Sequence, residues 1–423
     1  MPPLPVADRF QAARAPAQAA FCKHLKGDSL MSETIVIVSA TRTPMGSFQG
    51  DFAPLSANDL GGAVIKAAVE RAGLQPQQID EVIFGNVLTA GQGQAPARQA
   101  AIKAGLPIST GAVTLNKVCG SAMKAVMLAA DAIKAGSASV VVAGGMESMT
   151  NAPYLLKKAR GGYRLGHDKI YDHMMLDGLE DAYEEGRSMG LFGEDCAAKY
   201  NFTRQKQDDF AVASVQRAQS AIATGAFKEE ITPVIVKDRK GERVVDTDEG
   251  PGRIKPEKIP TLKPAFKKDG TVTAAASSSI NDGAAAVVLM TESRAKELGC
   301  KPLARIVSYA THSQEPGWFT TAPVQASEKA LKKAGWQVGD VDLWEVNEAF
   351  AVVPMALMHE LKVPHDKVNV NGGACALGHP IGASGARIIV TLLYALKKRG
   401  LKKGLATLCI GGGEGTAMAL ELL

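Results

Sequence analysis

Two cysteines and a histidine lie next to or near glycines in this 423-residue chain, and an asparagine follows an apolar, strand-like segment. Cys119 follows an apolar, strand-like segment and precedes an alanine-rich helical run, which places it at a strand-to-helix turn. Unpaired N–H groups at a helix N-terminus favour negative charge, so we expect a lowered thiol pKa and a thiolate nucleophile there. The alternative for this stretch alone is a buried cysteine that packs as a small hydrophobe.

The other three residues supply what a nucleophilic cysteine needs. His379 lies in GGACALGHPIGASGAR, Asn347 opens NEAFA, and Cys409 opens CIGGGEG. An imidazole can take the thiol proton so that the thiolate attacks a carbonyl carbon, and a second cysteine can act as acid and base at carbon. Each residue alone has a structural alternative, namely a structural histidine, a helix-capping asparagine and a core cysteine.

Composition limits the classes of function. With 46% hydrophobic and 22% charged residues the chain is typical of a globular protein, and no apolar run reaches the roughly 20 residues that span a membrane. The net charge of +5 permits an anionic substrate, and we expect no nucleic-acid partner. Six scattered cysteines without a C-x-x-C pair argue against disulfides or a zinc site and predict a reducing, cytoplasmic location. Pro96 replaces the third glycine of a dinucleotide loop, which argues against that cofactor.

The second half of the chain repeats the first. Identical residues recur 262 positions apart, as in ERAGLQPQQIDEV at 70–82 and KKAGWQVGDVDLW at 332–344. The identical pairs are Ala72 and Ala334, Gly73 and Gly335, Gln75 and Gln337, Asp80 and Asp342, and Gly120 and Gly382. Each half then runs through a long helix into a strand that ends in glycines. Such duplication predicts two similar α/β halves, with the corresponding turns meeting near a pseudo-twofold axis at one shared site.

The domain organisation follows from this repeat. We predict a disordered extension over residues 1–30, an N-terminal half formed by 31–150 and 280–302, and a C-terminal half over 303–423. Residues 151–279 are less regular, and we predict an inserted loop domain there that covers the substrate.

Six segments, taken in order, give the chain a close resemblance to the thiolases, particularly the tetrameric acetyl-CoA acetyltransferases. They are VCGSAMKA, GGMESMTNAPY, NDGAAA, NEAFA, GGACALGHPIGASGAR and CIGGG, and the resemblance runs from about Met31 to the C-terminus. It implies two similar α-β-α-β-α layered halves with a loop domain inserted in the first. It also implies a thioester Claisen condensation of two acetyl-CoA to acetoacetyl-CoA and CoA, or the reverse thiolysis, without a metal or other cofactor.

The resemblance assigns a role to each reactive residue. Cys119 matches the nucleophile that becomes acyl-cysteine, and His379 matches its activating base, whose Nε2–H later holds an enolate oxygen. Cys409 matches the acid and base that removes a proton from acetyl-CoA. Asn347 matches the residue that holds a water in one oxyanion site, while the N–H groups of Cys119 and Gly411 match the other.

Further positions resemble substrate and assembly contacts. Met189, Ser278 and Phe350 match positions beside the pantetheine of CoA, and Arg253 matches a phosphate partner. Residues 151–175 resemble the loop that joins two dimers, which predicts a homotetramer.

Three departures from the family bear on substrate range. Ser188 stands where many short-chain thiolases have His, residues 275–278 read Ala-Ala-Ser-Ser in place of Gly-Asn-Ala-Ser, and Glu414 replaces a common Met. A 3-ketoacyl-CoA thiolase of broader chain length therefore stays open as an alternative. Two further alternatives are less favoured. One is a ketoacyl synthase, which would need paired His, or His and Asn, around the nucleophilic cysteine in place of a second cysteine. The other is a non-catalytic lipid-binding relative, which would be expected to lack one of the catalytic groups.

Overall fold

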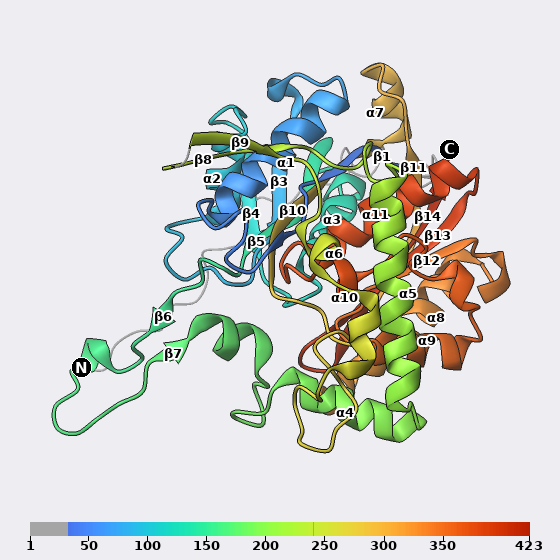
Figure 1. Ribbon diagram of the computed structural model, residues 1–423. Helices are drawn as coiled ribbons and strands as arrows, with labels where there is room; N and C mark the ends of the chain where they lie inside the picture. The colour runs from blue at the N-terminus through green and yellow to red at the C-terminus, as the bar shows by residue number, and fades with distance from the viewer. Residues whose placement is uncertain (1–32, 240) are drawn as a thin grey trace, which may run out of the picture. The chain divides into compact units, whose positions relative to one another are not determined.

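The computed structural model describes residues 33–239 and 241–423, and the extension expected over residues 1–30 lies outside them. Strands and helices alternate along the chain (Figure 1). The strands are β1 (Ile35–Arg42), β2 (Gly46–Ser47), β3 (Glu81–Gly85), β4 (Gly111–Leu115), β5 (Val140–Ser148), β6 (Tyr154–Leu155), β7 (Tyr171–Asp172), β8 (Val234–Asp238), β9 (Gly241–Val245), β10 (Asn281–Thr291), β11 (Ala304–Ser313), β12 (Leu343–Val346), β13 (Lys403–Ile410) and β14 (Glu414–Leu422). The helices are α1 (Ala57–Arg71), α2 (Pro96–Lys103), α3 (Ser121–Lys134), α4 (Met189–Tyr200), α5 (Arg204–Ala223), α6 (Glu249–Arg253), α7 (Glu292–Glu297), α8 (Ala322–Ala334), α9 (Val352–Leu361), α10 (Ala374–Leu377) and α11 (Ser384–Arg399).

The sheet topology shows the duplication. One sheet runs in the order β12-β13-β14-β11-β1-β10-β5-β3-β4, with β2 paired to β10. In the first half β3 is parallel to β5, while β5–β10 and β10–β1 are antiparallel. In the second half β12 is parallel to β13, while β13–β14 and β14–β11 are antiparallel. The order β11-β14-β13-β12 therefore repeats β1-β10-β5-β3, and the two halves join where β1 pairs with β11.

The repeat extends to single hydrogen bonds. Asp80 accepts hydrogen bonds from two successive N–H groups where β5 begins, and Asp342 accepts the same pair of bonds where β13 begins. Both aspartates thus close the end of a strand in equivalent positions. The predicted duplication is confirmed.

The core lies on both faces of the strands, because successive side chains of a strand point to opposite sides. Ile35 and Ile37 of β1 pack with α3 and α11, whereas Val36 and Val38 pack with α1 and α2. Helices α3 and α11 contact each other and the strands of both halves, while α8 and α9 pack on the other face of the second half. The predicted layered α-β-α-β-α arrangement is confirmed.

A long connection from β5 to β10 carries the segment predicted to be an insertion. It contains the small β6–β7 pair on an extended arm, the helices α4, α5 and α6, and the β8–β9 hairpin (Figure 1). The predicted domain boundaries at 151 and 279 stay a prediction. Within residues 33–239 and 241–423, no helix is long and apolar enough to cross a membrane.

Candidate active site

The turn that carries Cys119 joins β4 to α3, as predicted. Its backbone is strained, because Val118 has a φ of 45° and a β-branched residue rarely adopts that left-handed region. Local hydrogen bonds hold the turn in place. The N–H of Val118 donates to Asn116 Oδ1 at 2.8 Å, and Ser121 Oγ accepts from the N–H of Lys117 at 2.8 Å while donating to the carbonyl of Val118 at 2.6 Å.

The Cys119 thiol meets the glycine loop that follows β13. The N–H of Gly411 forms a hydrogen bond with it, and burial raises its pKa to about 11 although this N–H and that of Cys119 itself oppose the rise. The charge of Glu147 raises the pKa further. The predicted lowering of the thiol pKa is therefore wrong, because loss of water around a thiolate outweighs the two N–H groups.

His379 is buried with its tautomer fixed by a serine. Its Nδ1 lies 2.6 Å from Ser384 Oγ, and that hydroxyl donates its single hydrogen to the carbonyl of Pro380 at 2.9 Å. The hydroxyl must therefore accept from Nδ1–H, which leaves Nε2 without a hydrogen and able to take one. Burial, followed by the charge of Arg387, lowers the pKa of His379 to about 3, so the imidazole is neutral at ordinary pH.

The side-chain amide of Asn347 is held in one orientation beside His379. Arg387 Nη2 lies 3.4 Å from Asn347 Oδ1, so the amide nitrogen is turned toward His379 Nε2 at 3.5 Å. Arg387 also meets the buried carboxyl of Glu345 at 3.4 Å. Arg387 thus orients the Asn347 amide so that its N–H group lies beside His379 Nε2, and an N–H donor placed there can stabilise negative charge on an oxygen.

Cys409 is the second-to-last residue of β13, lies two residues before Gly411 and is 1% exposed. Burial, and then the neighbouring Cys119 thiol, raise its pKa well above the usual value. The two thiols are thus close enough to influence each other, and both are protonated near neutral pH. Two thiols and an unprotonated imidazole nitrogen are arranged for proton transfer rather than as a preformed ion pair.

A buried carboxylate that the sequence analysis missed supports this arrangement. Glu147 of β5 accepts hydrogen bonds from Asn86 Nδ2 at 2.7 Å and from the N–H groups of Val87, Leu88 and Gly382 at 3.0, 3.1 and 2.9 Å. It therefore ties the loop after β3 to the turn that follows His379. The sequence signals were its position in the glycine-rich end of a buried strand and its place in the GGMESMTNAPY segment.

The predicted CoA contacts divide into two groups. Met189 lies beside Gly411 and packs in the same cluster as Phe350 and Cys409, and the N–H of Ser278 donates to the carbonyl next to Phe350 at 2.9 Å. Met189 and Phe350 thus share a cluster with Cys409, and a backbone hydrogen bond joins Ser278 to the segment that carries Phe350.

Arg253 is placed differently. Its largely exposed guanidinium pairs with Glu249 one turn earlier in α6. That carboxylate also accepts from the N–H groups of Ser47 and Asp51 at 2.8 and 3.1 Å. The structure thus joins Arg253 to the β2 turn rather than to the other predicted site residues. No cluster of three His, Cys, Asp or Glu side chains that could hold a metal occurs in the described part of the chain.

Comparison with known proteins identifies the family of the chain. A family model described as the thiolase N-terminal domain matches residues 35–293, and one described as the thiolase C-terminal domain matches residues 300–422. The acetyl-CoA acetyltransferase of Pseudomonas aeruginosa is 55% identical over 390 residues, which cover 92% of this chain and 99% of that protein. The acetyl-CoA acetyltransferase of Cupriavidus necator is 54% identical over 389 residues, with coverage of 92% and 99%.

Two solved structures are similar in fold and sequence. The acetyl-CoA acetyltransferase of Bacillus anthracis matches with a TM-score of 0.90 and 43% identity, covering 93% of this chain and 99% of that one. The Acat5 thiolase of Ascaris suum, solved in complex with coenzyme A, matches with a TM-score of 0.87 and 45% identity, covering 92% and 100%. Both family models, the near-complete coverage and the shared fold agree, and the chain belongs to the thiolase family.

Proposed function

We propose that the protein is an acetyl-CoA C-acetyltransferase that condenses two acetyl-CoA to acetoacetyl-CoA and CoA, or runs the reverse thiolysis. The observation that carries this proposal is the meeting of two thiols at one site. The Cys119 thiol bonds to the N–H of Gly411 with Cys409 beside it, and the neutral His379 has an unprotonated Nε2. One thiol can carry an acyl group while the other moves a proton on carbon.

In the first half-reaction, the Cys119 thiol proton passes to His379 Nε2 as the sulfur attacks the carbonyl carbon of acetyl-CoA. The N–H groups of Cys119 and Gly411 stabilise the resulting oxyanion. The carbon–sulfur bond to CoA breaks, and the leaving thiolate takes the proton of Cys409. The products are acetyl-Cys119, CoA, an imidazolium and the Cys409 thiolate.

In the second half-reaction, the Cys409 thiolate removes a methyl proton from another acetyl-CoA. His379 Nε2–H, with a water held by Asn347, stabilises the enolate oxygen. The enolate carbon attacks the acetyl carbon of acetyl-Cys119, and acetoacetyl-CoA leaves as the Cys119 sulfur recovers its proton from the imidazolium. All three groups return to their starting protonation states, so neither a metal nor a redox cofactor is required.

A specific observation favours a broader-chain 3-ketoacyl-CoA thiolase as the second candidate. Ser188 directly precedes Met189, and Met189 lies against Gly411. A small side chain there leaves more room for an acyl chain than the histidine common in short-chain relatives. Thiolysis rates for acetoacetyl-CoA and for longer 3-ketoacyl-CoA substrates distinguish the two. Higher kcat/KM for acetoacetyl-CoA supports the first proposal, and a preference for six or more acyl carbons would replace it with the second.

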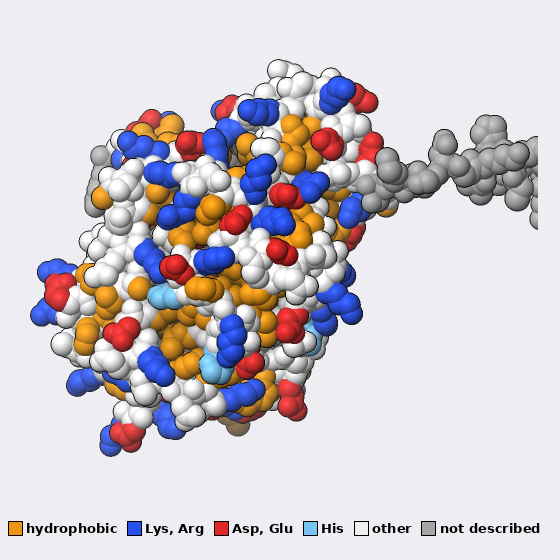
Figure 2. All heavy atoms as spheres, turned by 90° about the vertical axis from the view of Figure 1, so that its right-hand side faces the viewer, with side chains coloured by type: hydrophobic (Ala, Val, Ile, Leu, Met, Phe, Trp, Pro, Cys, Tyr) orange, Lys and Arg blue, Asp and Glu red, His pale blue; other side chains and the backbone are white. Residues whose placement is uncertain are grey.

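CoA would bind beside the two thiols. Met189, Ser278 and Phe350 would contact the pantetheine, and Arg253 would release Glu249 to meet a phosphate. The substrates are CoA thioesters, and we place the enzyme in the cytoplasm, where the five described free cysteines would stay reduced. On the face shown in Figure 2, Lys and Arg side chains are interspersed with Asp and Glu, which supports a protein without a nucleic-acid partner.

We also propose a homotetramer, built from dimers through the arm that carries β6 and β7. Large apolar side chains on this arm are exposed, including Tyr154 at 68%, Leu165 at 99% and Ile170 at 65%. Exposed apolar side chains so close together are typical of a contact surface. Light scattering on the purified protein tests this: a tetramer is expected, and a stable dimer at micromolar concentration would contradict the role of the arm.

A further inference from the structure

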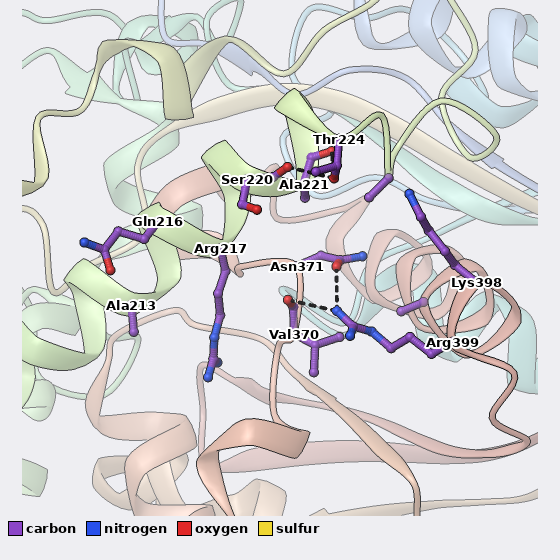
Figure 3. A pocket seen from close by; sticks show the side chains of 12 residues that line it. Ala213, Gln216, Arg217, Ser220, Ala221, Thr224, Val370, Asn371, Lys398 and Arg399 are labelled. Carbon is purple, nitrogen blue, oxygen red and sulfur yellow. Dashed lines mark hydrogen bonds between the residues drawn. The ribbon is translucent and has the colours of Figure 1, made fainter.

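A cavity of about 540 Å³ lies between α5 and the C-terminal end of α11 (Figure 3). This volume is in the range of small-molecule sites. The reactive residues lie at the other end of α11, since Ser384 in its first turn bonds His379. The helix has 16 residues, so its length separates the two places by about 22 Å. The cavity is therefore distinct from the proposed active site.

Three cations from two helices line this cavity. Arg217 comes from α5, and Lys398 and Arg399 come from the last turn of α11, while no Asp or Glu is among the described residues that line it. Figure 3 shows the side chains of Lys398 and Arg399 extending from α11 toward α5. Basic residues at the end of a helix are common because they complement its dipole. That explanation does not apply to Arg217, which lies in the middle of another helix.

Both guanidinium groups are held in position by the segment that precedes α10. Arg217 donates to the carbonyls of Val368 at 2.8 Å and His365 at 3.2 Å. Arg399 donates to the carbonyl of Val370 at 3.4 Å and to Asn371 Oδ1 at 3.3 Å, as the dashed lines in Figure 3 mark. Each group keeps further N–H donors free for a ligand, because a guanidinium has five.

None of the described residues that line the cavity carries a negative charge to balance its three cations. Burial lowers the pKa of Arg217, and the like charge of Arg399 lowers it further, although Glu348 and Asp366 oppose this. Glu348 is already bonded to Asn369, Ser214 and the N–H of Cys375. The ammonium of Lys398 forms no hydrogen bond or ion pair with any residue that the structure describes. An anion between the three groups would relieve their repulsion.

We propose that this cavity binds a small anion with two or more phosphate groups, held by Arg217, Lys398 and Arg399. Guanidinium groups suit phosphate because their parallel N–H donors match its oxygens, and an ammonium adds a point charge. The source is either the diphosphate of a CoA molecule or a free polyphosphate such as a nucleotide. This site is independent of the proposed catalysis.

Titration of the full-length protein with pyrophosphate, followed by calorimetry, tests the proposal. Saturable binding with a Kd of about 1 mM or tighter is expected in low salt, and it should weaken as salt is added. Lys398→Glu should weaken it at least about tenfold, since it replaces an attraction by a repulsion at contact distance. Lys402→Glu is the matched control, because it makes the same charge change at an exposed lysine outside the cavity.

Competition separates the possible outcomes. Pyrophosphate should still bind when one equivalent of CoA occupies the catalytic site. Binding of a second equivalent of CoA would identify the coenzyme as the source of the diphosphate. Binding of ATP without a second CoA would identify a free nucleotide. Equal affinities in Lys398→Glu and Lys402→Glu, or full displacement of pyrophosphate by one equivalent of CoA, would overturn the proposal. Activity with acetoacetyl-CoA should be retained in both variants, so failure here leaves the proposed function unaffected.

Discussion

Replacing His379 by asparagine should change both the rate of acetyl transfer and its dependence on pH. In the native protein the imidazole has a pKa of about 3 and the Cys119 thiol one of about 11. The imidazole is neutral above the first value and the thiol is protonated below the second. Neither group titrates between about pH 5 and 9, so the native rate of Cys119 acetylation should change little across this range, and any change near pH 7 should follow Glu147, whose pKa burial raises to about 7.

The asparagine variant lacks the group that accepts the proton during attack. Its acetylation must then rely on the thiolate already present, which is about one part in 10⁴ at about pH 7 for a pKa of about 11. The rate should fall by about 10²–10⁴ at this pH. It should also rise about tenfold for each unit of pH, because the thiolate fraction does so below the pKa. Rapid quenching followed by mass spectrometry measures the acetylation of Cys119 directly.

His359→Asn is a suitable control, because His359 is an exposed histidine on α9. It should leave both the rate and the flat profile unchanged. Two results would refute the reasoning about His379. One is a variant that acetylates at the native rate with no dependence on pH. The other is a native profile with an inflection near pH 6.5 that persists in a Glu147→Gln variant, which would show that the imidazole titrates as it does in water; the second variant is needed because burial raises the pKa of Glu147 to about 7.

Three further substitutions test separate parts of the site. In the Cys409→Ala variant Cys119 should still become acetylated, whereas deuterium exchange into the acetyl methyl group and acetoacetyl-CoA synthesis should fall at least about 10²-fold. Equal losses of acetylation and exchange would mean that Cys409 has no separate role. Ser384→Ala should lower kcat more than it raises KM, because His379 loses the partner that fixes its tautomer, and an unchanged kcat would contradict this. Glu414→Gln should cost only about 0.2–1 kcal/mol of stability, measured by urea unfolding, because its lysine partner is partly exposed; a loss several times larger would show that this ion pair is essential to the fold.

The architecture could be predicted from the sequence where a pattern recurs within it. The 262-residue offset related Asp80 to Asp342, and the structure shows why both are aspartates: each closes the start of a strand with two hydrogen bonds. The turn at Cys119 could also be predicted, because an apolar strand and an alanine-rich helix lie on either side of it. Local patterns such as these are visible without tertiary contacts.

The environment of the reactive groups could not be predicted in this way. The expected lowering of the Cys119 pKa considered only the helix N-terminus, whereas burial by residues distant in sequence determines its direction. Ser384 and Arg387 were overlooked for a similar reason. Their importance depends on distances to His379 and Asn347, and an alternating pattern of small and apolar residues in a helix does not reveal which side chains face a neighbouring loop.

The measurement that tests the central claim most directly is mass spectrometry of the protein after mixing with acetyl-CoA. The account predicts one added acetyl group, located by peptide mapping on Cys119, and none on a Cys119→Ser variant, because a hydroxyl gives up its proton far less readily than a thiol and is the weaker nucleophile. The acetyl group should disappear when CoA is added. Acetylation of Cys409 in its place, or acetylation of Cys119→Ser at the native rate, would contradict the assignment of Cys119 as the nucleophile.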